Sequence, residues 1–373
     1  MLSVDGRTLI NFASNDYLGL SKHPALKQRA IEFIERFGAG SGSSRLVSGN
    51  LEAYEQLERK IAAFKGTEAA LVLPSGYQTN ATVIAALGRK QTVLFSDHEN
   101  HNSIAVGLQL AQGKWFRYSH NDLTHLETRL QQHIAHDERT KWVVSETVFS
   151  MDGDATDVNA LNQLATAFGA SVYLDEAHAT GVLGPEGRGL CFGKGTNGIV
   201  MGTFSKAMGS FGAYIACSKI MREYLVNFCS GLIYSTALPP AVLGSIDAAL
   251  DVVPELESER EQLQSASEHV RVRLQAMGFA TGRSTTQIIP IVIGEDDDAL
   301  KLAQYLEENE ILAPAIRPPT VLEGEARVRI SLTAKHTPEQ IHKLLATIAK
   351  FSAVKTHLKK ESLLLDKECA THV

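Results

Sequence analysis

Short apolar runs alternate with longer helix-like intervals over residues 65–219, and this alternation constrains the fold more than any other feature. The runs are mostly apolar on both faces, as strands buried between two layers of helices should be. The expected strands are Ala69–Leu73, Thr92–Ser96, Trp115–Tyr118, Lys141–Thr147, Ser171–Asp175, Ile199–Thr203 and Ala213–Cys217. The pattern predicts an α/β fold with a mainly parallel sheet of about seven strands between helices.

Three of the intervals carry apolar residues at helical spacing and are predicted helices, namely Gly76–Leu87, Asn102–Gln112 and Asp157–Phe168. The last two strands are separated only by Phe204–Gly212, which is short for a parallel crossover. This short connection favours an antiparallel orientation for Ala213–Cys217.

Pro239-Pro240 marks a break, after which the pattern is that of a smaller α+β domain. Its expected elements are a long helical region Ala241–Met277, a strand Ile288–Ile293, a helix Ala299–Asn309, a short run Ile311–Ala313, a strand Ala326–Leu332 and a helix Pro338–Phe351. We therefore divide the chain into an N-terminal segment (1–45), a large α/β domain (46–240), a small C-terminal α+β domain (241–354) and a charged tail (355–373) expected to be mobile.

The 373 residues are 44% hydrophobic and 21% charged, which suits a soluble enzyme of two domains. The net charge of −6 is spread without long blocks, so a broad basic face for nucleic acid is not expected. No apolar run reaches membrane-spanning length, and the first residues lack a signal-peptide core. The four cysteines form no Cys-x-x-Cys pair, so no zinc site or disulfide framework is indicated and a cytoplasmic setting is expected.

A lysine and an aspartate follow two of the predicted strands. Lys206 lies in the hydroxyl-rich turn Thr203-Phe204-Ser205-Lys206, and Asp175 ends the preceding strand. Ligands of open α/β sheets bind at this edge of the strands. In pyridoxal phosphate (PLP) chemistry the protein supplies two groups: a lysine that forms a Schiff base and a carboxylate that holds the pyridinium nitrogen. Each residue also has a simpler interpretation, as a solvated loop lysine and a helix N-cap aspartate.

Two histidines lie close to the same predicted edge. His178 follows Asp175 by three residues and is a candidate partner for the phenolic oxygen of the cofactor ring, or a core histidine. His101, within Asp97–Ser103, is a candidate to stack its flat ring on the cofactor. A metal site there is disfavoured, because metal-ligand spacing is not completed elsewhere.

Ser75–Asn80 opens a predicted helix, whose first N–H groups favour a phosphate, although a plain turn and cap has the same pattern. Thr203 and Ser205 are candidates to add hydroxyl contacts to the phosphate. Glu146 and Ser150 close another strand and are candidates to reach the ring substituents.

Two further motifs carry alternatives. Gly38–Arg45 contains a Gly-x-Gly pattern but follows a helix-like segment, so we interpret it as a flexible connection and not a dinucleotide loop. Arg329 lies on a predicted strand, where a guanidinium would bind a substrate carboxylate through two parallel hydrogen bonds. Arg327 shares its face by alternation, so the pattern does not choose between them, and either is also typical of a surface strand.

In this order the motifs resemble those of the α-oxoamine synthases, a fold-type I PLP-dependent family, from Asn11 to about residue 350. The matching motifs are Asn11–Leu20, Ser44–Gly49, Asp175–His178 and Thr203–Lys206. The chain departs from the family at two places. It starts near the first motif without the usual leading helix, so either the start is truncated or the acyl end is held differently. Asn102 follows His101 where the family usually has alanine.

The resemblance implies a role for each candidate residue. Lys206 carries the cofactor and later moves the substrate α-proton, Asp175 pairs with the pyridinium, His178 pairs with the phenolic oxygen and His101 stacks over the ring. Gly76 and Tyr77 bind the phosphate through their backbone, with Ser150 and Thr203 nearby, while Arg329 binds the amino-acid carboxylate and Thr320 lies on the substrate side. Ser235 and Thr236 reach the phosphate of the partner subunit in an expected homodimer with shared active sites.

Within this family, Ile233–Pro240 and Ala315–Val321 favour members that join L-alanine to a pimeloyl thioester, with loss of carbon dioxide. The acyl carrier, CoA or a carrier protein, stays open. A synthase using glycine with acetyl-CoA or succinyl-CoA and an aminotransferase on the same fold are the alternative enzymes. A non-catalytic binding protein is disfavoured by the intact Lys206, Asp175 and His178.

Overall fold

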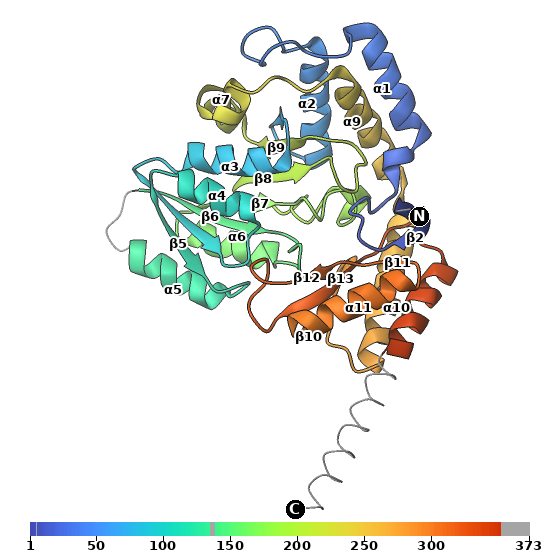
Figure 1. Cartoon of the computed structure of the whole chain (residues 1–373). Helices are drawn as coiled ribbons and strands as arrows, with labels where there is room; N and C mark the ends of the chain where they lie inside the picture. Colours follow the sequence, from blue (N-terminus) through green and yellow to red (C-terminus); the bar gives the residue numbers. More distant parts are fainter. Residues whose placement is uncertain (5, 135–138, 352–373) are drawn as a thin grey trace, which may run out of the picture. The chain divides into compact units, whose positions relative to one another are not determined.

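The computed structural model describes residues 1–4, 6–134 and 139–351 (Figure 1). Two compact units divide the chain, and each is described by itself. Unit 2 comprises Asn15–Ser150 and Asp154–Glu261, and unit 1 comprises Met1–Ser14, Met151–Gly153 and the chain from Gln262. The four-part division predicted above stays a prediction, and its tail lies outside the described residues.

A seven-stranded sheet forms the core of the described part of unit 2, in the order β3-β9-β8-β7-β6-β4-β5 (Figure 1). Its strands are β3 (Ala69–Leu73), β4 (Thr92–Asp97), β5 (Lys114–Tyr118), β6 (Thr140–Glu146), β7 (Ser171–Asp175), β8 (Gly198–Thr203) and β9 (Ala213–Cys217). β9 runs antiparallel to β3 and β8, and the pairs from β8 through β5 are parallel. The predicted α/β fold class is confirmed, including the antiparallel last strand.

Helices cover both faces of this sheet. Leu71, Val144 and Ile215 belong to one apolar cluster that also holds residues of α3, α4, α7 and α8. Phe95 and Val143 alternate with members of that cluster and are also fully buried, so the opposite face is covered as well. The helices are α1 (Pro24–Phe37), α2 (Glu52–Lys65), α3 (Gly76–Leu87), α4 (Asn102–Leu110), α5 (Leu123–Ile134), α6 (Val158–Ala167), α7 (Lys219–Phe228), α8 (Ser230–Ile233) and α9 (Pro240–Val252). Burial on both faces explains why β3, β8 and β9 are almost wholly apolar, whereas the edge strand β5 is mostly exposed.

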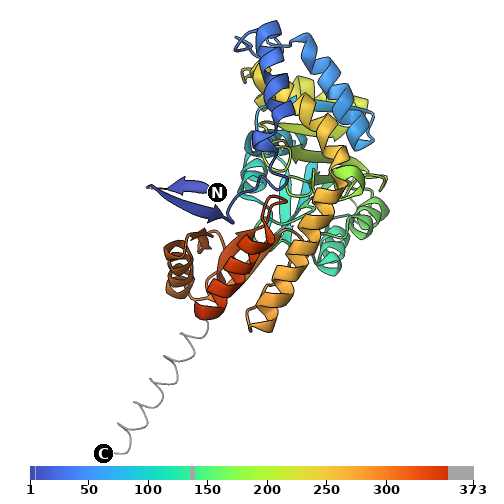
Figure 2. The same cartoon turned by 90° about the vertical axis from the view of Figure 1, so that its right-hand side faces the viewer.

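Unit 1 holds two small sheets in its described part. The strands β1 (Leu2–Val4), β2 (Arg7–Asn11) and β11 (Ile311–Leu312) form one sheet, and β10 (Ile288–Gly294), β13 (Ala326–Ser331) and β12 (Ala315–Ile316) form the other. Figure 2 shows the β1–β2 hairpin, which the sequence analysis did not predict. The helix α11 (Asp296–Glu308) and helical residues 338–351 belong to the same unit.

The long helical region expected over Ala241–Met277 is divided into two helices. α9 ends at Val252, a 3₁₀ turn follows over Val253–Glu255, and α10 spans Glu257–Ala276. Pro254 has no backbone N–H to donate, and its ring clashes with the preceding helical turn, so an α-helix cannot pass through this position.

Candidate active site

The carboxyl ends of the parallel strands meet at one edge of the sheet in unit 2. Glu146 at the end of β6 pairs with Asp175 at the end of β7, and Asp175 pairs with Met201 near the end of β8. Thr203, the last residue of β8, pairs with Ala213, the first residue of the reversed strand β9. This register brings the strand-end residues predicted from the sequence to a common edge.

Asp175 is buried, and its carboxylate accepts two hydrogen bonds. Oδ2 accepts one from Nδ2 of Asn80 at 2.7 Å, and Oδ1 accepts one from the backbone N–H of Ala177 at 2.8 Å. Asn80 lies on α3, so a helix side chain and a backbone group together orient the carboxylate. Sequence reasoning missed Asn80, because its partner lies 95 residues away in the chain.

His101 is the N-cap of α4, and its ring nitrogen Nδ1 accepts a hydrogen bond from the backbone N–H of Ser103 at 3.2 Å. The backbone N–H of His101 in turn donates to the carboxylate of Glu146. Burial lowers the pKa of His101, with Asp175 opposing this shift and Lys206 adding to it. His101 is thus tied to the end of β6, where Glu146 pairs with Asp175 in the sheet.

Glu146 is buried beside Asp175, and its pKa lies well above the usual range. Burial is the main cause, and the negative charge of Asp175 adds to it. The N–H of His101 and the charge of Lys206 act in the opposite direction. Glu146 therefore takes up a proton more readily than an exposed glutamate.

His178 is buried, and its Nδ1 lies 2.7 Å from the hydroxyl of Tyr17. The same hydroxyl donates to Oδ1 of Asn15 at 3.0 Å. The ring of His178 is therefore held by a buried tyrosine of the first sequence motif, 161 residues away. Tyr17 belongs to that motif, but the sequence alone gave it no role.

Lys206 lies partly buried in the turn between β8 and β9. Oγ1 of Thr203 donates to the carbonyl of Gly212 at 2.9 Å and accepts the N–H of Ser205 at 3.2 Å. The N–H of Phe204 also donates to Gly212, so both ends of the turn are closed. This bonding holds the backbone that carries the lysine.

The first turn of α3 lies at the end of β3. Ser75 caps the helix, with Oγ accepting the N–H of Gln78 at 3.3 Å. Gly76 and Tyr77 are its first two residues, whose N–H groups have no partner within a helix. Such N–H groups bind anions well.

The remaining predicted residues of unit 2 lie in connecting segments. Ser150 is partly buried in the segment that follows β6. Ser235 is partly buried and Thr236 is exposed, with Thr236 forming an isolated antiparallel bridge to Ser44. The bridge ties the glycine-rich segment Gly38–Arg45 to the residues that precede α9.

Arg329 and Thr320 belong to unit 1. Arg329 is buried on β13, and its Nη1 donates to Oγ of Ser331 at 2.7 Å. Arg327 on the same strand pairs with Asp152 at 2.6 Å and with Glu325 at 3.1 Å. Arg327 is thus already bound to two carboxylates of its own chain.

Thr320 is exposed after β12, and its N–H donates to the carbonyl of Arg317.

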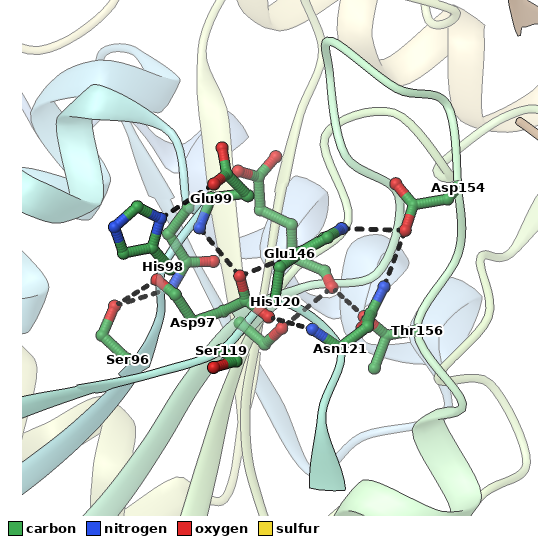
Figure 3. Close-up of polar contacts among 12 residues, drawn as sticks. Ser96, Asp97, His98, Glu99, Ser119, His120, Asn121, Glu146, Asp154 and Thr156 are labelled. Atoms are coloured by element: carbon green, nitrogen blue, oxygen red, sulfur yellow. Dashed lines mark hydrogen bonds and ion pairs between the residues drawn. The ribbon is translucent and has the colours of Figure 1, made fainter. Parts of the chain in front are cut away.

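His120, which the sequence analysis missed, lies between two buried carboxylates (Figure 3). Its Nδ1 is 3.0 Å from Oδ1 of Asp97, and its Nε2 is 2.9 Å from Oδ2 of Asp154. Asn121 donates to the same two carboxylates, at 2.8 Å in each case. Each ring nitrogen faces a carboxylate oxygen that accepts a hydrogen bond, and donating to both requires the imidazolium form of His120.

This imidazolium links three segments next to the candidate site. Asp97 ends β4 and accepts the N–H of Glu99, two residues before His101. Asp154 lies in the segment that follows β6 and Glu146. Hydrogen bonds to the two carboxylates and their charges raise the pKa of His120 to about 9, against the opposing effect of burial.

Replacing His120 by Gln is expected to destabilise the protein most at low pH. The folded-state pKa is raised above 6.5, so the histidine's contribution is fully present below pH 6.5 and is lost as the pH rises through about 9. The rise of the pKa from 6.5 to about 9 corresponds to about 3 kcal/mol in the free energy of unfolding. Urea unfolding of wild type and His120→Gln at pH 6 and pH 10 measures the difference. An equal loss at both pH values would contradict the imidazolium. His269→Gln, on an exposed histidine of α10, is the control.

Two absences hold within the described residues. No group of three or more His, Cys, Asp or Glu side chains there is arranged to hold a metal ion. No helix in that part of the chain is long and apolar enough to cross a membrane.

Comparisons with known proteins place this geometry in a family. Residues 7–348 match the family model of aminotransferase class I and II. The 8-amino-7-oxononanoate synthase of Gluconacetobacter diazotrophicus is 52% identical over 351 residues, which cover 92% of this chain and 88% of that protein. The chain belongs to the 8-amino-7-oxononanoate synthase family. The resemblance to the α-oxoamine synthases is thereby confirmed, and the chain is a PLP-dependent acyltransferase.

Solved structures of this fold type are similar throughout. A serine palmitoyltransferase variant from S. paucimobilis, described with a bound PLP–myriocin aldimine, has a TM-score of 0.89 and 29% identity, covering 94% of this chain and 89% of that one. The 8-amino-7-oxononanoate synthase from Francisella tularensis has a TM-score of 0.81 and 28% identity, covering 93% and 99%. The prediction that PLP is the cofactor is confirmed by these relationships.

Proposed function

We propose that this chain condenses L-alanine with pimeloyl-CoA or a pimeloyl-carrier protein, releasing the thiol and carbon dioxide and giving 8-amino-7-oxononanoate for biotin biosynthesis. The observation that carries the proposal is the 52% identity, over 92% of the chain, with a relative of that name. The alternatives, a glycine-using synthase and an aminotransferase, lack such a relative among the proteins compared above.

The side chains at the sheet edge fit PLP. Asp175 offers a buried, oriented carboxylate to the ring nitrogen, and His178 offers a ring nitrogen to the phenolic oxygen. His101 offers a flat ring to stack, and Gly76, Tyr77, Ser150 and Thr203 surround the phosphate in our assignment. When bound, PLP supplies an electron sink for the carbanion that forms at the α-carbon of the amino acid.

Lys206 would hold the cofactor, and its amine would accept the proton from the α-carbon of the amino acid. A lysine near cationic groups or out of water has a larger neutral fraction, which is the form that accepts a proton. Asp175 keeps a proton on the ring nitrogen by offsetting its positive charge. Exclusion of water matters, because water would protonate the carbanion before it meets the thioester.

Arg329 is our candidate for binding the carboxylate of L-alanine, with Thr320 on the substrate side. Arg327, on the same strand, pairs with Asp152 and Glu325. A guanidinium binds a carboxylate through two parallel hydrogen bonds, which gives both affinity and orientation.

A homodimer with shared active sites completes the proposal. Ser235 and Thr236 then reach the phosphate bound by the partner subunit. We place the enzyme in the cytoplasm, where its free cysteines Cys191, Cys217 and Cys229 stay reduced. Nucleic acid and membranes are not among the partners that we propose.

Arg329→Lys is expected to raise the KM for L-alanine about 10-fold to 100-fold, because a lysine cannot form two parallel hydrogen bonds. Arg327→Lys is the matched control on the same strand and face, and it is expected to leave this KM nearly unchanged. Steady-state kinetics with varied L-alanine measures both. The reverse ranking would assign the carboxylate to Arg327.

Thiol release by the PLP-loaded protein tests the proposed reaction. L-Alanine and glycine are each combined with pimeloyl-, acetyl- and succinyl-CoA, and with pimeloyl-carrier protein. We expect fast release only with L-alanine and a pimeloyl donor. Preference for glycine with a short acyl-CoA would replace the proposed substrates, and amino transfer to a keto acid without thiol release would replace the reaction.

A further inference from the structure

Asn80 occupies a central position among the buried side chains of unit 2. The residue is 2% exposed, and both its amide nitrogen and its amide oxygen have hydrogen-bond partners. Nδ2 donates to Oδ2 of Asp175 at 2.7 Å and to Oγ of Ser103 at 2.9 Å. Oδ1 accepts from the hydroxyl of Tyr173 at 2.7 Å. One side chain thus contacts the carboxylate assigned to the ring nitrogen and the helix cap that holds the stacking histidine.

The partners determine which way the amide of Asn80 points. A reversed amide would place Oδ1 against the carboxylate of Asp175, where two acceptors face each other. It would also leave the hydroxyl of Tyr173 facing an N–H₂ group, which has no lone pair to accept a hydrogen bond. Burial and Asp175 raise the pKa of Tyr173 well above its usual range, so its hydroxyl stays protonated and donates.

The hydrogen bond from Asn80 to Ser103 has a consequence for His101. Oγ of Ser103 lies 2.8 Å from Nδ1 of His101, and the N–H of Ser103 also donates to Nδ1. Nδ1 accepts the N–H of Ser103 and so carries no proton to donate, which makes Oγ the donor in this contact. The hydrogen bond from Asn80 occupies one lone pair of Oγ and favours this orientation of the hydroxyl. A ring nitrogen that accepts two donors carries no proton, so neutral His101 is protonated on Nε2.

We propose that Asn80 is a positioning residue that orients the Asp175 carboxylate and, through Ser103, sets the proton of His101 on Nε2. The assignment rests on the proposed function, in which Asp175 and His101 contact the PLP ring. Asn80 itself contacts neither substrate nor cofactor in this account. It couples the group at the ring nitrogen to the group over the ring face.

Asn80→Asp is the most direct test, because it keeps the shape and replaces the donating N–H₂ group by an acceptor. The new carboxylate repels Asp175 and accepts the hydroxyl hydrogen of Ser103, which then no longer reaches His101. We expect neutral His101 to shift toward the form protonated on Nδ1. We also expect the Kd for PLP to rise about 10-fold to 100-fold, as for the loss of a hydrogen bond to a charged group.

Two measurements read the effect without substrate turnover. Nitrogen-15 NMR of the histidine-labelled, PLP-free protein gives the protonated nitrogen of His101, assigned with the His101→Gln spectrum. Fluorescence titration of the same protein with PLP gives the Kd. Asn162→Asp is the matched control, since Asn162 is also a buried helical asparagine, bonded to Gly195 and Asn197 away from this network. It is expected to change neither reading.

Ser103→Ala supplies a second variant if Asn80→Asp folds poorly. It removes the shorter hydrogen bond to His101 and leaves the bond between Asn80 and Asp175 in place. We expect the Nδ1 resonance of His101 to move while the Kd for PLP changes much less than in Asn80→Asp. An unchanged Nδ1 resonance in this variant would overturn the route through Ser103.

The outcomes separate this inference from the proposed function. If Asn80→Asp shows the same His101 spectrum and the same Kd for PLP as the wild type, the positioning role is overturned, whatever the substrates are. If the variants behave as expected but the wild type does not join L-alanine to a pimeloyl donor, the positioning role of Asn80 stands and the proposed function is overturned.

Discussion

In the central sheet, Glu146 pairs with Asp175 and Asp175 with Met201, and the candidate site depends on this backbone register. A shift by one residue would turn the carboxylate of Asp175 to the opposite face of the sheet. The strands are almost wholly apolar and buried on both faces, so the polar side chains at their ends gather at the carboxyl edge. The turn with Lys206, the first turn of α3 and the segment before α4 all begin at this edge.

Buried carboxylates at this edge need compensating groups, because an unpaired buried charge is costly. Asp97 is paired with His120, and Asp175 accepts from Asn80 and Ala177. Glu146 accepts only a backbone N–H among the contacts described above, and its pKa is raised. The three carboxyl groups therefore differ in their hydrogen-bond partners, although they end neighbouring strands. Asp175 is the one oriented for a cationic ring nitrogen.

Local patterns predicted much of this protein. The bounds of β3, β7, β9 and α3 agree with the expected ranges, because hydrophobic periodicity and strand-end polar residues are local signals. The break at Pro254 was missed because the flanking residues kept a helical pattern on both sides. Asn80, Tyr17 and His120 were missed for another reason. Each is a single polar residue whose partners come from other segments, and one sequence does not reveal such pairs.

Reduction of the PLP-loaded protein with borohydride, followed by peptide mass mapping, identifies the lysine that carries the cofactor. Borohydride fixes a pyridoxyl phosphate group permanently on the lysine that carries the cofactor. We expect this added mass on the peptide that contains Lys206, and we expect it to be absent in Lys206→Ala. The same mass on another lysine, or labelling that persists in Lys206→Ala, would contradict the assignment of this sheet edge as the active site.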